Sequence, residues 1–346
     1  MRALVTGGSG FLGSHIVALL LERGHSVRIL DLNPPEREES KVEFIQGSIT
    51  DAPIVSTATR AIDVVFHVAA KAGLWARDDR EFYEINDVGA RTVLEAAQAN
   101  GVARIVHTST ESILKCAQKA PDAPTDETVE PQLSDMVGPY CVGKFLAEQR
   151  AMEAAKAGAP VVVVNPTVPV GPGDRNLTPP TRMLLGFLNG ENGAFLETTL
   201  NLTDVRDIAQ GHIAAWERGR IGERYILGGE NVRLSDLLRR LEEVSGLRMP
   251  KRKVPYWVAH GFALLNETWS NTVSGQPPRA PLTGVKLARS PMIFDNRKAR
   301  VELGLSFRPL ERSLKDALVW MGEQGLLKRS PDWERVGAAP RQSAES

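Results

Sequence analysis

Cysteine is scarce in this sequence of 346 residues, which contains only Cys116 and Cys141. So few thiols exclude a disulfide framework and a cysteine metal cage. Net charge is absent as well, because 42 Lys and Arg residues balance 42 Asp and Glu residues. The chain therefore has no strong overall basic field with which to bind nucleic acid or a membrane surface, although a local basic patch stays open.

Long hydrophobic runs are also lacking. No segment reaches the ~18 apolar residues that a membrane-spanning helix needs. The first residues, MRALVTGG, predict a strand rather than a signal peptide. With 42% hydrophobic and 24% charged residues, the composition is that of an ordinary globular protein. We therefore expect a soluble, cytoplasmic protein whose partner is a small molecule, with no nucleic acid and no membrane span.

Histidine is present but scattered. No two of the six have the close spacing of metal ligands, so we expect structural roles for them and no metal site. They are His15, His25, His67, His107, His212 and His260.

The first 165 residues alternate short apolar runs with stretches of helical spacing. The predicted strands are Arg2–Thr6, Ser26–Leu30, Val42–Ile45, Asp63–Val68, Ala103–Thr108 and Pro160–Val164. Continuous Val/Ile/Leu runs are typical of parallel strands buried on both faces. The helices are predicted at Phe11–Glu22, Asp87–Asn100 and Tyr140–Ala157. This alternation predicts an α/β fold, a Rossmann-type doubly wound parallel sheet.

Residues 166–330 have a less regular pattern, which predicts a smaller, mixed substrate-binding lobe with some segments returning to the first sheet. Two strands are expected in it, at Phe195–Thr199 and Arg224–Leu227. The apolar stretch Trp257–Leu265 is interpreted first as a core-packing helix and second as the lining of an apolar pocket. The segment Cys116–Asp135 is predicted to be an exposed loop, and residues 331–346 a disordered tail.

Residues 6–13, TGGSGFLG, form a glycine-rich turn between the first strand and the first helix. Such a turn lets the backbone approach a pyrophosphate and directs a helix N-terminus at it. Asp31 ends the second strand, where a carboxylate binds the adenosine ribose and repels a 2′-phosphate, so NAD is favoured over NADP. The nearby Arg28 and Arg37 leave room for a phosphate to be tolerated.

Tyr140 is the one tyrosine with a lysine four residues later, at Lys144, so both side chains lie on one helical face. An ammonium there is expected to lower the phenol pKa, which would let Tyr140 exchange a proton with a carbonyl or an alcohol. The strand ending at Thr108 supplies two hydroxyls, Ser109 and Thr110, at the carboxyl edge of the sheet, where ligands bind. Either could hold the substrate oxygen.

With these motifs the chain resembles the extended short-chain dehydrogenase/reductase (NAD-dependent epimerase/dehydratase) family over about residues 1–325. The TGxxGxxG loop, the DVVFHVAA strand, the NDVGA helix start, the YxxxK pair and the late FD..KA..ELG pattern all match. Within the family the chain resembles the dihydroflavonol-reductase-like branch, and in that branch the hopanoid-associated sugar epimerase group. The stretches that carry this likeness are HVAA…LWARD at 67–78, NPTVPVGPGD at 165–174 and ERYILGGEN at 223–231.

The resemblance implies the site residues. Thr110, Tyr140 and Lys144 would be catalytic, with Ser109 as the alternative hydroxyl. The residues expected to bind the cofactor are Gly7, Gly10, Phe11, Leu12, Gly13, Asp31, Ser48, Ile49, Ala69, Ala70, Lys71, Asn86, Thr108, Tyr140, Lys144, Pro166 and Val168. The helices that hold Asn86 and Tyr140 would pair in a homodimer, again by resemblance alone.

Several positions depart from the family pattern. The acid that contacts adenine is replaced at Gly47–Ser48, and the serine of YxxSK is Gly143. In nucleotide-sugar enzymes an Arg-Asp pair lies shortly before a late Asp, and aligning on Asp207 puts Leu200–Asn201 there. Leucine cannot replace the bidentate arginine contact with a phosphate. The strand that ends at Asn165–Pro166 also lacks the Arg-Pro common in those enzymes, so a less charged substrate is favoured.

Three functions remain open at this point. The first is an NAD(H)-dependent oxidoreductase that interconverts a carbonyl and a secondary alcohol. The second is a sugar epimerase or dehydratase that retains its NAD. The third is a non-catalytic dinucleotide sensor, which the Tyr140–Lys144 pair disfavours because a sensor needs no proton donor.

Overall fold

The computed structural model describes residues 1–36, 40–114 and 123–337. Arg37, Cys116 and the last nine residues, on which earlier expectations fell, lie outside the described residues.

A seven-stranded parallel sheet forms the larger part of the molecule, in the order β3-β2-β1-β4-β5-β6-β9. Its strands are β1 (Arg2–Thr6), β2 (Ser26–Asp31), β3 (Val42–Gln46), β4 (Val64–His67), β5 (Arg104–Thr108), β6 (Val161–Pro166) and β9 (Arg224–Leu227). Because the order reverses at β1 and β4, the carboxyl ends of these strands open a crevice for a ligand. The predicted fold class is confirmed.

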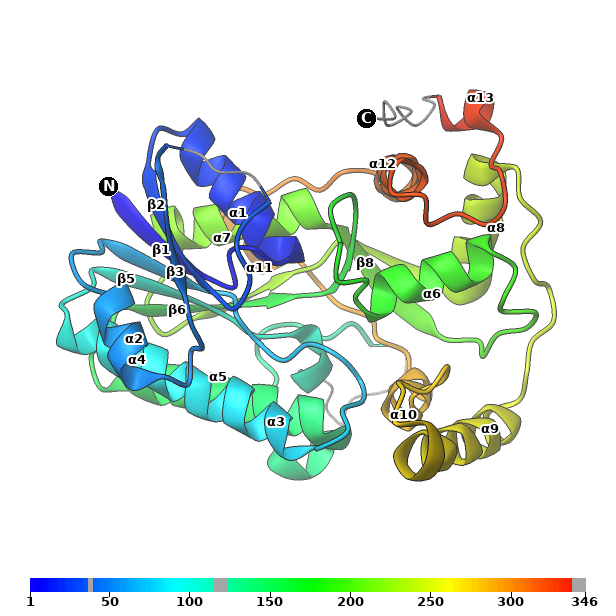
Figure 1. Cartoon of the computed structure of the whole chain (residues 1–346), viewed down its shortest axis with the longest axis horizontal. Coiled ribbons are helices and arrows are strands. Elements are labelled where there is room, and N and C mark those ends of the chain that lie inside the picture. Colours follow the sequence, from blue (N-terminus) through cyan, green and yellow to red (C-terminus); the bar gives the residue numbers. More distant parts are fainter. Residues whose placement is uncertain (37–39, 115–122, 338–346) are drawn as a thin grey trace.

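Helices cover both faces of this sheet (Figure 1). On one face lie α1 (Phe11–Glu22), α7 (Val205–Arg218) and α11 (Arg297–Glu302). On the other lie α2 (Ala52–Ala58), α4 (Gly89–Ala99) and α5 (Gly138–Lys156), with α3 (Arg80–Tyr83) and the π-helical turn η1 (Glu84–Val88) beside α5. Two apolar cores, one per face, follow from strands that are buried on both sides.

The smaller lobe is built on a mixed three-stranded sheet, β10-β8-β7. Its strands are β7 (Val168–Val170), β8 (Thr199–Asp204) and β10 (Glu230–Arg233); β7 and β8 are parallel, and β8 and β10 antiparallel. The helices of the lobe are α6 (Pro179–Leu188), α8 (Leu234–Ser245), α9 (Tyr256–Trp269), α10 (Leu282–Ala288), α12 (Leu310–Glu323) and α13 (Trp333–Val336). Short turns η2 (Glu111–Ile113), η3 (Leu133–Asp135) and η4 (Ser270–Ser274) complete the elements.

One strand prediction for residues 166–330 is wrong and the other is confirmed. The strand expected at Phe195–Thr199 begins only at Thr199, and Phe195 contributes just an isolated bridge to Lys253. The strand predicted at Arg224–Leu227 is β9, which pairs with β6 at the edge of the large sheet and so is one of the segments that return to it. The domain boundary between residues 165 and 166 stays a prediction, and β6 extends one residue beyond it.

The predicted exposed loop and the predicted disordered tail are both more ordered than expected. In the described part of Cys116–Asp135, Thr125 and Val129 are buried, and the Glu127 carboxylate accepts a hydrogen bond from the Ile226 backbone N–H. The expectation of an exposed loop is therefore wrong for these residues. The tail is likewise structured up to residue 337, because Val336 of α13 is buried in the core of the lobe.

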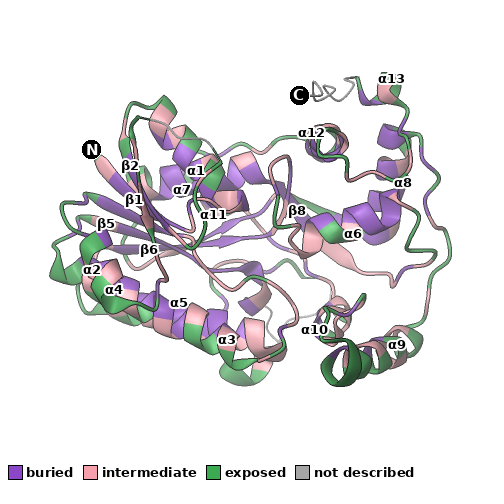
Figure 2. Ribbon diagram, in the orientation of Figure 1, coloured by how far each residue is buried: buried purple, intermediate pink, exposed green. Residues whose placement is uncertain are grey.

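The apolar helix expected to pack in the core does not do so. Along α9, which is described in full, only Ala263 is buried, and Figure 2 shows the helix exposed at the periphery of the molecule. None of the helices in the described ranges is long and apolar enough to cross a membrane.

Candidate active site

The glycine loop brings the backbone of β1 close to that of the segment after β4. Gly7 has φ +71°, and a Cβ there would lie 2.8 Å from the backbone of Ala69. A Cβ on Gly13 would lie 2.0 Å from the Gly7 carbonyl oxygen. Only glycine fits at these two positions, and both were expected to line a pyrophosphate.

The first turn of α1 follows this loop directly. Gly10 is its N-cap, and no described side chain caps the turn, which begins at Phe11 and Leu12. The first backbone N–H groups of a helix have no partner within it, so they and the helix dipole attract an anion. The close glycine packing and the uncapped helix fit the diphosphate of a dinucleotide.

Asn86 fixes the segment that passes beside the glycine loop. Its side-chain oxygen accepts a hydrogen bond from the Lys71 N–H at 2.7 Å, and its amide donates to the Lys71 carbonyl at 3.3 Å. Asn86 is buried in the π-helical turn η1, a kind of distortion frequent at functional sites. It therefore orders the Ala69–Lys71 segment, and the contact of this segment and of Asn86 with a cofactor stays a prediction.

Asp31 lies at the end of β2 beside the glycine loop. One carboxylate oxygen accepts a hydrogen bond from the Ser9 N–H at 3.0 Å, and the other from the Asn33 N–H at 3.2 Å. Arg28 does not stand beside it as a phosphate ligand. Its guanidinium is buried, and it donates to Glu43 at 2.9 Å and to main-chain carbonyls that include Ala58 at 2.7 Å.

Of the two residues expected to contact adenine, Ser48 lies in a surface turn and Ile49 is buried. The Ser48 hydroxyl is 2.8 Å from that of Thr50 in a turn after β3. Ile49 is buried, and its side chain lies against Gly89, where an added Cβ would be 2.5 Å away. A contact between either residue and adenine stays a prediction.

Tyr140 lies at the start of α5 near Thr110, whose hydroxyl acts to lower the pKa of the phenol. Thr110 in turn donates to the Glu111 carboxylate at 2.8 Å. The Ser109 hydroxyl is buried and has no hydrogen-bond partner among the described residues. The structure thus brings Thr110, and not Ser109, to the tyrosine.

The electrostatics of the phenol differ from the expectation. Burial raises the pKa of Tyr140 above its ordinary value, and the charge of Glu111 raises it further. The nearby Thr110 hydroxyl acts in the opposite direction. The expected lowering of the Tyr140 pKa by Lys144 is therefore wrong in this structure, because the lysine ammonium is directed elsewhere.

Lys144 points into the protein beneath the end of β5. Its Nζ donates to the Thr108 carbonyl oxygen at 2.6 Å, and burial lowers the pKa of the ammonium to about 8. The charge of Glu148, one helical turn further along α5, partly opposes this shift. Thr108 itself directs its hydroxyl to His212 Nε2 at 2.9 Å, so its contribution to a cofactor site would come from the main chain.

Glu148 and Asn165 hold the floor of the site together. The Asn165 amide donates to the Glu148 carboxylate at 2.7 Å and to the Thr110 carbonyl at 3.2 Å, and Arg224 lies 3.0 Å from the other Glu148 oxygen. Asn165 is fully buried, so it does not offer its side chain to a substrate.

The two residues predicted to flank the nicotinamide stand at the change from one sheet to the other. Pro166 ends β6 and Val168 begins β7. Both residues lie at the carboxyl edge of the sheet. Their contact with the nicotinamide stays a prediction.

Tyr140 packs against a mainly apolar cluster. Its members include Ile113, Leu114, Ile226, Leu287 and Met292, and the side chains of Leu74, Met136, Val137 and Leu200 pack against the same cluster. Leu200 is the residue expected to align with the nucleotide-binding arginine of nucleotide-sugar enzymes. Its neighbour Asn201 is used internally, donating to Asn231 at 2.7 Å and accepting from the Gly229 N–H at 2.9 Å.

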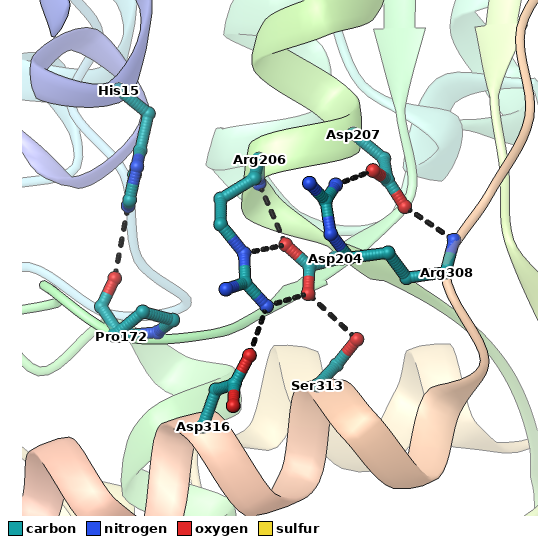
Figure 3. A network of polar contacts seen from close by, with 8 residues as sticks. All are labelled: His15, Pro172, Asp204, Arg206, Asp207, Arg308, Ser313 and Asp316. Atoms are coloured by element: carbon teal, nitrogen blue, oxygen red, sulfur yellow. Dashed lines mark hydrogen bonds and ion pairs between the residues drawn. The ribbon is translucent and has the colours of Figure 1, made fainter.

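A polar network fixes the small lobe to the cofactor half (Figure 3). Arg206 at the start of α7 pairs with Asp204 and with Asp316 of α12, each at 2.6 Å, and Ser313 donates to Asp204 at 2.7 Å. Burial acts to raise the pKa of Asp204, but the hydrogen bonds from Arg206 and Ser313 lower it overall.

Two further contacts extend this network. His15 of α1 lies 2.9 Å from the Pro172 carbonyl, and Arg308 pairs with Asp207. The first links the glycine-loop helix to the segment after β7, so the network keeps the two lobes in register. No group of three or more metal-ligating side chains occurs in the described ranges.

Sequence reasoning missed two carboxyls of the site, Glu111 and Glu148. Burial raises the pKa of Glu111 to about 6, although hydrogen bonds from Thr110 and Ser112 lower it. Glu148 had a visible signal, since it follows Lys144 by four residues and so shares the face of Tyr140. Glu111 had none, because nothing in the sequence shows that this charged residue is buried.

Comparisons with known proteins show the family to which the chain belongs. The family model described as "NAD dependent epimerase/dehydratase family" matches residues 3–228. The "Putative dihydroflavonol 4-reductase" of Synechocystis is 37% identical over 331 residues, which cover 94% of this chain and 95% of that protein. The 2-alkyl-3-oxoalkanoate reductase of Stenotrophomonas maltophilia is 30% identical over 317 residues, covering 88% of this chain and 94% of that protein.

Among solved structures, the crystal structure of gox2253 is similar with a TM-score of 0.81 and 34% identity. The match covers 94% of this chain and 99% of that one.

Proposed function

This chain belongs to the NAD dependent epimerase/dehydratase family, and from that premise we propose that it is an NAD(H)-dependent oxidoreductase acting on a small, weakly charged substrate. It would interconvert a ketone and a secondary alcohol. The observation that carries the proposal is the position of Tyr140 near Thr110 and against an apolar cluster that Leu200 also borders.

Each site residue has a role in this reaction. Bound nicotinamide supplies or accepts the hydride. Tyr140 gives its phenolic proton to the substrate oxygen during reduction and takes it back during oxidation. Thr110 holds the same oxygen by a hydrogen bond. Lys144 has a pKa lowered to about 8, so it is mostly charged at neutral pH, and its hydrogen bond to the Thr108 carbonyl would hold the end of β5 beside the reacting groups.

The substrate is assigned by what surrounds the tyrosine. Leu200 stands where a nucleotide-sugar enzyme would use arginine, and Asn201 is occupied by Gly229 and Asn231. A diphosphate would meet no charge-assisted donor there, so its desolvation would go uncompensated. The names of the two relatives above, both reductases, support carbonyl reduction as well.

The proposed cofactor is NAD rather than NADP. In this proposal Asp31, which lies beside the glycine loop, would face the adenosine ribose and repel a 2′-phosphate, and Arg28 is already used by Glu43 and main-chain carbonyls. As finer proposals we retain the likeness to the dihydroflavonol-reductase-like branch and its hopanoid-associated group, and the homodimer through the helices that hold Asn86 and Tyr140.

Tyr140→Phe tests the mechanism, with Tyr83→Phe as the control, since Tyr83 is an exposed tyrosine on the neighbouring helix α3. Oxidation of NADH would be followed with cyclohexanone and acetophenone as ketone probes. We expect Tyr140→Phe to bind NADH normally and to lose ~100- to 10,000-fold in kcat. Equal activity in the two variants would refute the assigned role.

The nucleotide retained by the purified protein separates the oxidoreductase from an epimerase or dehydratase. An epimerase restores its cofactor in each turnover, whereas a reductase must exchange it. Denatured protein would be analysed by chromatography and mass spectrometry. Little retained nucleotide with reversible NADH binding is expected. Stoichiometric NAD in the released fraction would overturn the proposal in favour of the epimerase.

A further inference from the structure

Helix α9 and the following turn η4 have their apolar residues on the outside. Of the thirteen large hydrophobic side chains exposed in the described residues, seven lie between residues 257 and 273. They are Trp257, Val258, Phe262, Leu264, Leu265, Trp269 and Val273. Trp257 and Leu265 are exposed by 75% and 74%. At 100° per residue, the α9 members fall on one broad face of the helix.

The opposite face attaches the helix to the protein through polar groups. The Asn266 side chain accepts a hydrogen bond from the Arg279 N–H at 2.8 Å, and Glu267 accepts one from the Leu282 N–H at 2.7 Å. Tyr256 packs beneath the guanidinium of Arg289, 5.4 Å from its ring centroid. In an ordinary surface helix the apolar side faces the core. In α9 the polar side contacts the protein and the apolar side is exposed.

Two threonine hydroxyls of this segment are hydrogen-bonded within their own helix. Thr268 donates to the Leu264 carbonyl at 2.7 Å, and Thr272 donates to the Thr268 carbonyl at the same distance. Such back-bonding to the preceding turn satisfies a hydroxyl within its own helix. The exposed face can therefore enter an apolar medium without leaving these two polar groups unpaired.

The segments before and after this face in the sequence are basic, although Lys253 is paired with Glu197 at 2.5 Å. Residues 244–294 contain seven Lys and Arg residues against the single acid Glu267, a net charge of +6 in a chain whose total is zero. The basic residues are Arg248, Lys251, Arg252, Lys253, Arg279, Lys286 and Arg289, all exposed. This is the local basic patch that the overall composition left open.

We propose that α9 and η4 dock on the surface of an anionic lipid bilayer, lying in the interface without crossing it. A helix with Trp, Phe and Leu on its exposed face binds at the boundary between headgroups and acyl chains. Each Lys or Arg near an anionic surface adds to the attraction. Both features of the patch are met by this one partner.

Other occupants fit less well. In a symmetric contact between two copies of the chain the same patch meets itself, so the basic rims would face each other and repel. The three segments outside the described residues read REE, KCAQKAPD and AAPRQSAES. None of them contains a large apolar side chain with which to cover the face.

The docked segment packs against α10, which in turn borders the predicted catalytic tyrosine. A Cβ on Gly138, at the start of α5, would lie 2.6 Å from the Thr283 hydroxyl of α10. Leu287 of α10 packs in the same cluster as Tyr140. Docking would therefore bring this edge of the site to the lipid surface, whatever reaction the site performs.

Flotation of the full chain with lipid vesicles tests the proposal without any assay of activity. The probes are vesicles of phosphatidylcholine alone and of phosphatidylcholine with phosphatidylglycerol in a two-to-one ratio. We expect co-flotation with the anionic vesicles, little with the neutral ones, and weaker binding at high salt. The double variant Leu265→Glu/Trp269→Glu should bind at least ~10-fold more weakly.

Val301→Glu is the matched control, because Val301 is equally exposed but lies on α11. It should float like the parent chain, and circular dichroism with NADH binding shows that each variant is folded. Lys251→Glu/Arg252→Glu should remove most of the preference for anionic lipid. Brominated lipids should quench tryptophan fluorescence in the parent chain, and much less in Trp257→Phe/Trp269→Phe.

Three results would overturn the proposal. The first is the absence of binding to anionic vesicles by the folded chain. The second is binding that the Leu265→Glu/Trp269→Glu variant retains. The third is a concentration-dependent dimer in sedimentation that this variant abolishes, which would assign the face to a second copy of the chain.

Discussion

Gly143 lies between Tyr140 and Lys144 on α5, at the position where the family pattern has serine. A Cβ at this position would lie 2.5 Å from the Phe82 carbonyl oxygen and 3.3 Å from Asn86 Cβ. The first contact is with backbone, so it cannot be relieved by turning a side chain. Gly143→Ala should therefore push α5 away from α3 and η1, the elements that order the cofactor segment.

The expected loss can be worked out from two opposing effects. Alanine in place of glycine stabilises a helix by ~1 kcal/mol. Forcing an extra carbon into a packed contact costs ~1–3 kcal/mol and more when backbone must move. We expect the clash to win, with a net loss of ~1–2 kcal/mol in the free energy of unfolding for Gly143→Ala, and a larger loss for Gly143→Ser.

Gly261 supplies the matched control, since it lies within α9 and a Cβ there would meet nothing within 4 Å. Gly261→Ala should show the helix effect alone, a gain of up to ~1 kcal/mol. Guanidinium unfolding followed by circular dichroism gives both values. If Gly143→Ala equals or exceeds the stability of the parent chain while Gly261→Ala gains as expected, the close approach to Phe82 is not a constraint and the reasoning fails.

Three further predictions concern charge. The pKa of Glu111 is raised to about 6 in the folded chain, so the parent chain should lose about 2 kcal/mol of unfolding stability as pH rises from about 4.5 through about 6. Glu111→Gln should remove this loss. It should also shift the alkaline limb of the pH–rate profile to lower pH, since the phenol of Tyr140 no longer faces a negative charge; an unshifted limb contradicts the coupling. Asp31→Ala should reduce the preference for NADH over NADPH ~10–100-fold in kcat/KM, and a retained preference would assign it to other residues. Asp204→Asn should lower unfolding stability by ~2 kcal/mol at neutral pH and less at pH 3, because the folded carboxyl has a lowered pKa and the unfolded carboxyl takes up a proton once pH falls below ~4; the same loss at both values would exclude the ion pair with Arg206 as its cause.

Most of the large sheet could be predicted because its strands are buried on both faces and carry continuous apolar runs. The runs at Arg2–Thr6 and Ser26–Leu30 agree with β1 and β2 to within a residue. In the small lobe β8 has no continuous apolar run and buries polar side chains such as Asn201 and Thr203, so the signal in its sequence is weaker. The apolar Phe195 marked a core position and not a strand, and β8 begins at Thr199, where polar residues alternate with apolar ones.

The prediction for Trp257–Leu265 failed for a different physical reason. Helical periodicity shows that apolar residues share a face, but it does not show which way that face points. The direction is set by tertiary contacts that Asn266 and Glu267 make with residues far along the chain. The tail was mispredicted in a similar way, since Val336 is a single apolar residue and its burial depends on the core it meets.

At the active site, the spacing of Tyr140 and Lys144 correctly predicted a shared helical face but not the direction of the charge interactions. A face exposed to solvent would let the ammonium lower the phenol pKa. Here burial lowers the pKa of Lys144, and the charge of Glu148 partly opposes that shift. Burial raises the pKa of Tyr140, and the charge of Glu111 raises it further. The lysine is thus closer to losing its proton at neutral pH than an exposed lysine would be, and the tyrosine holds its proton more firmly. Both effects favour a site that begins its cycle with a neutral phenol, which is the state that a reductase needs when it delivers a proton to a carbonyl oxygen.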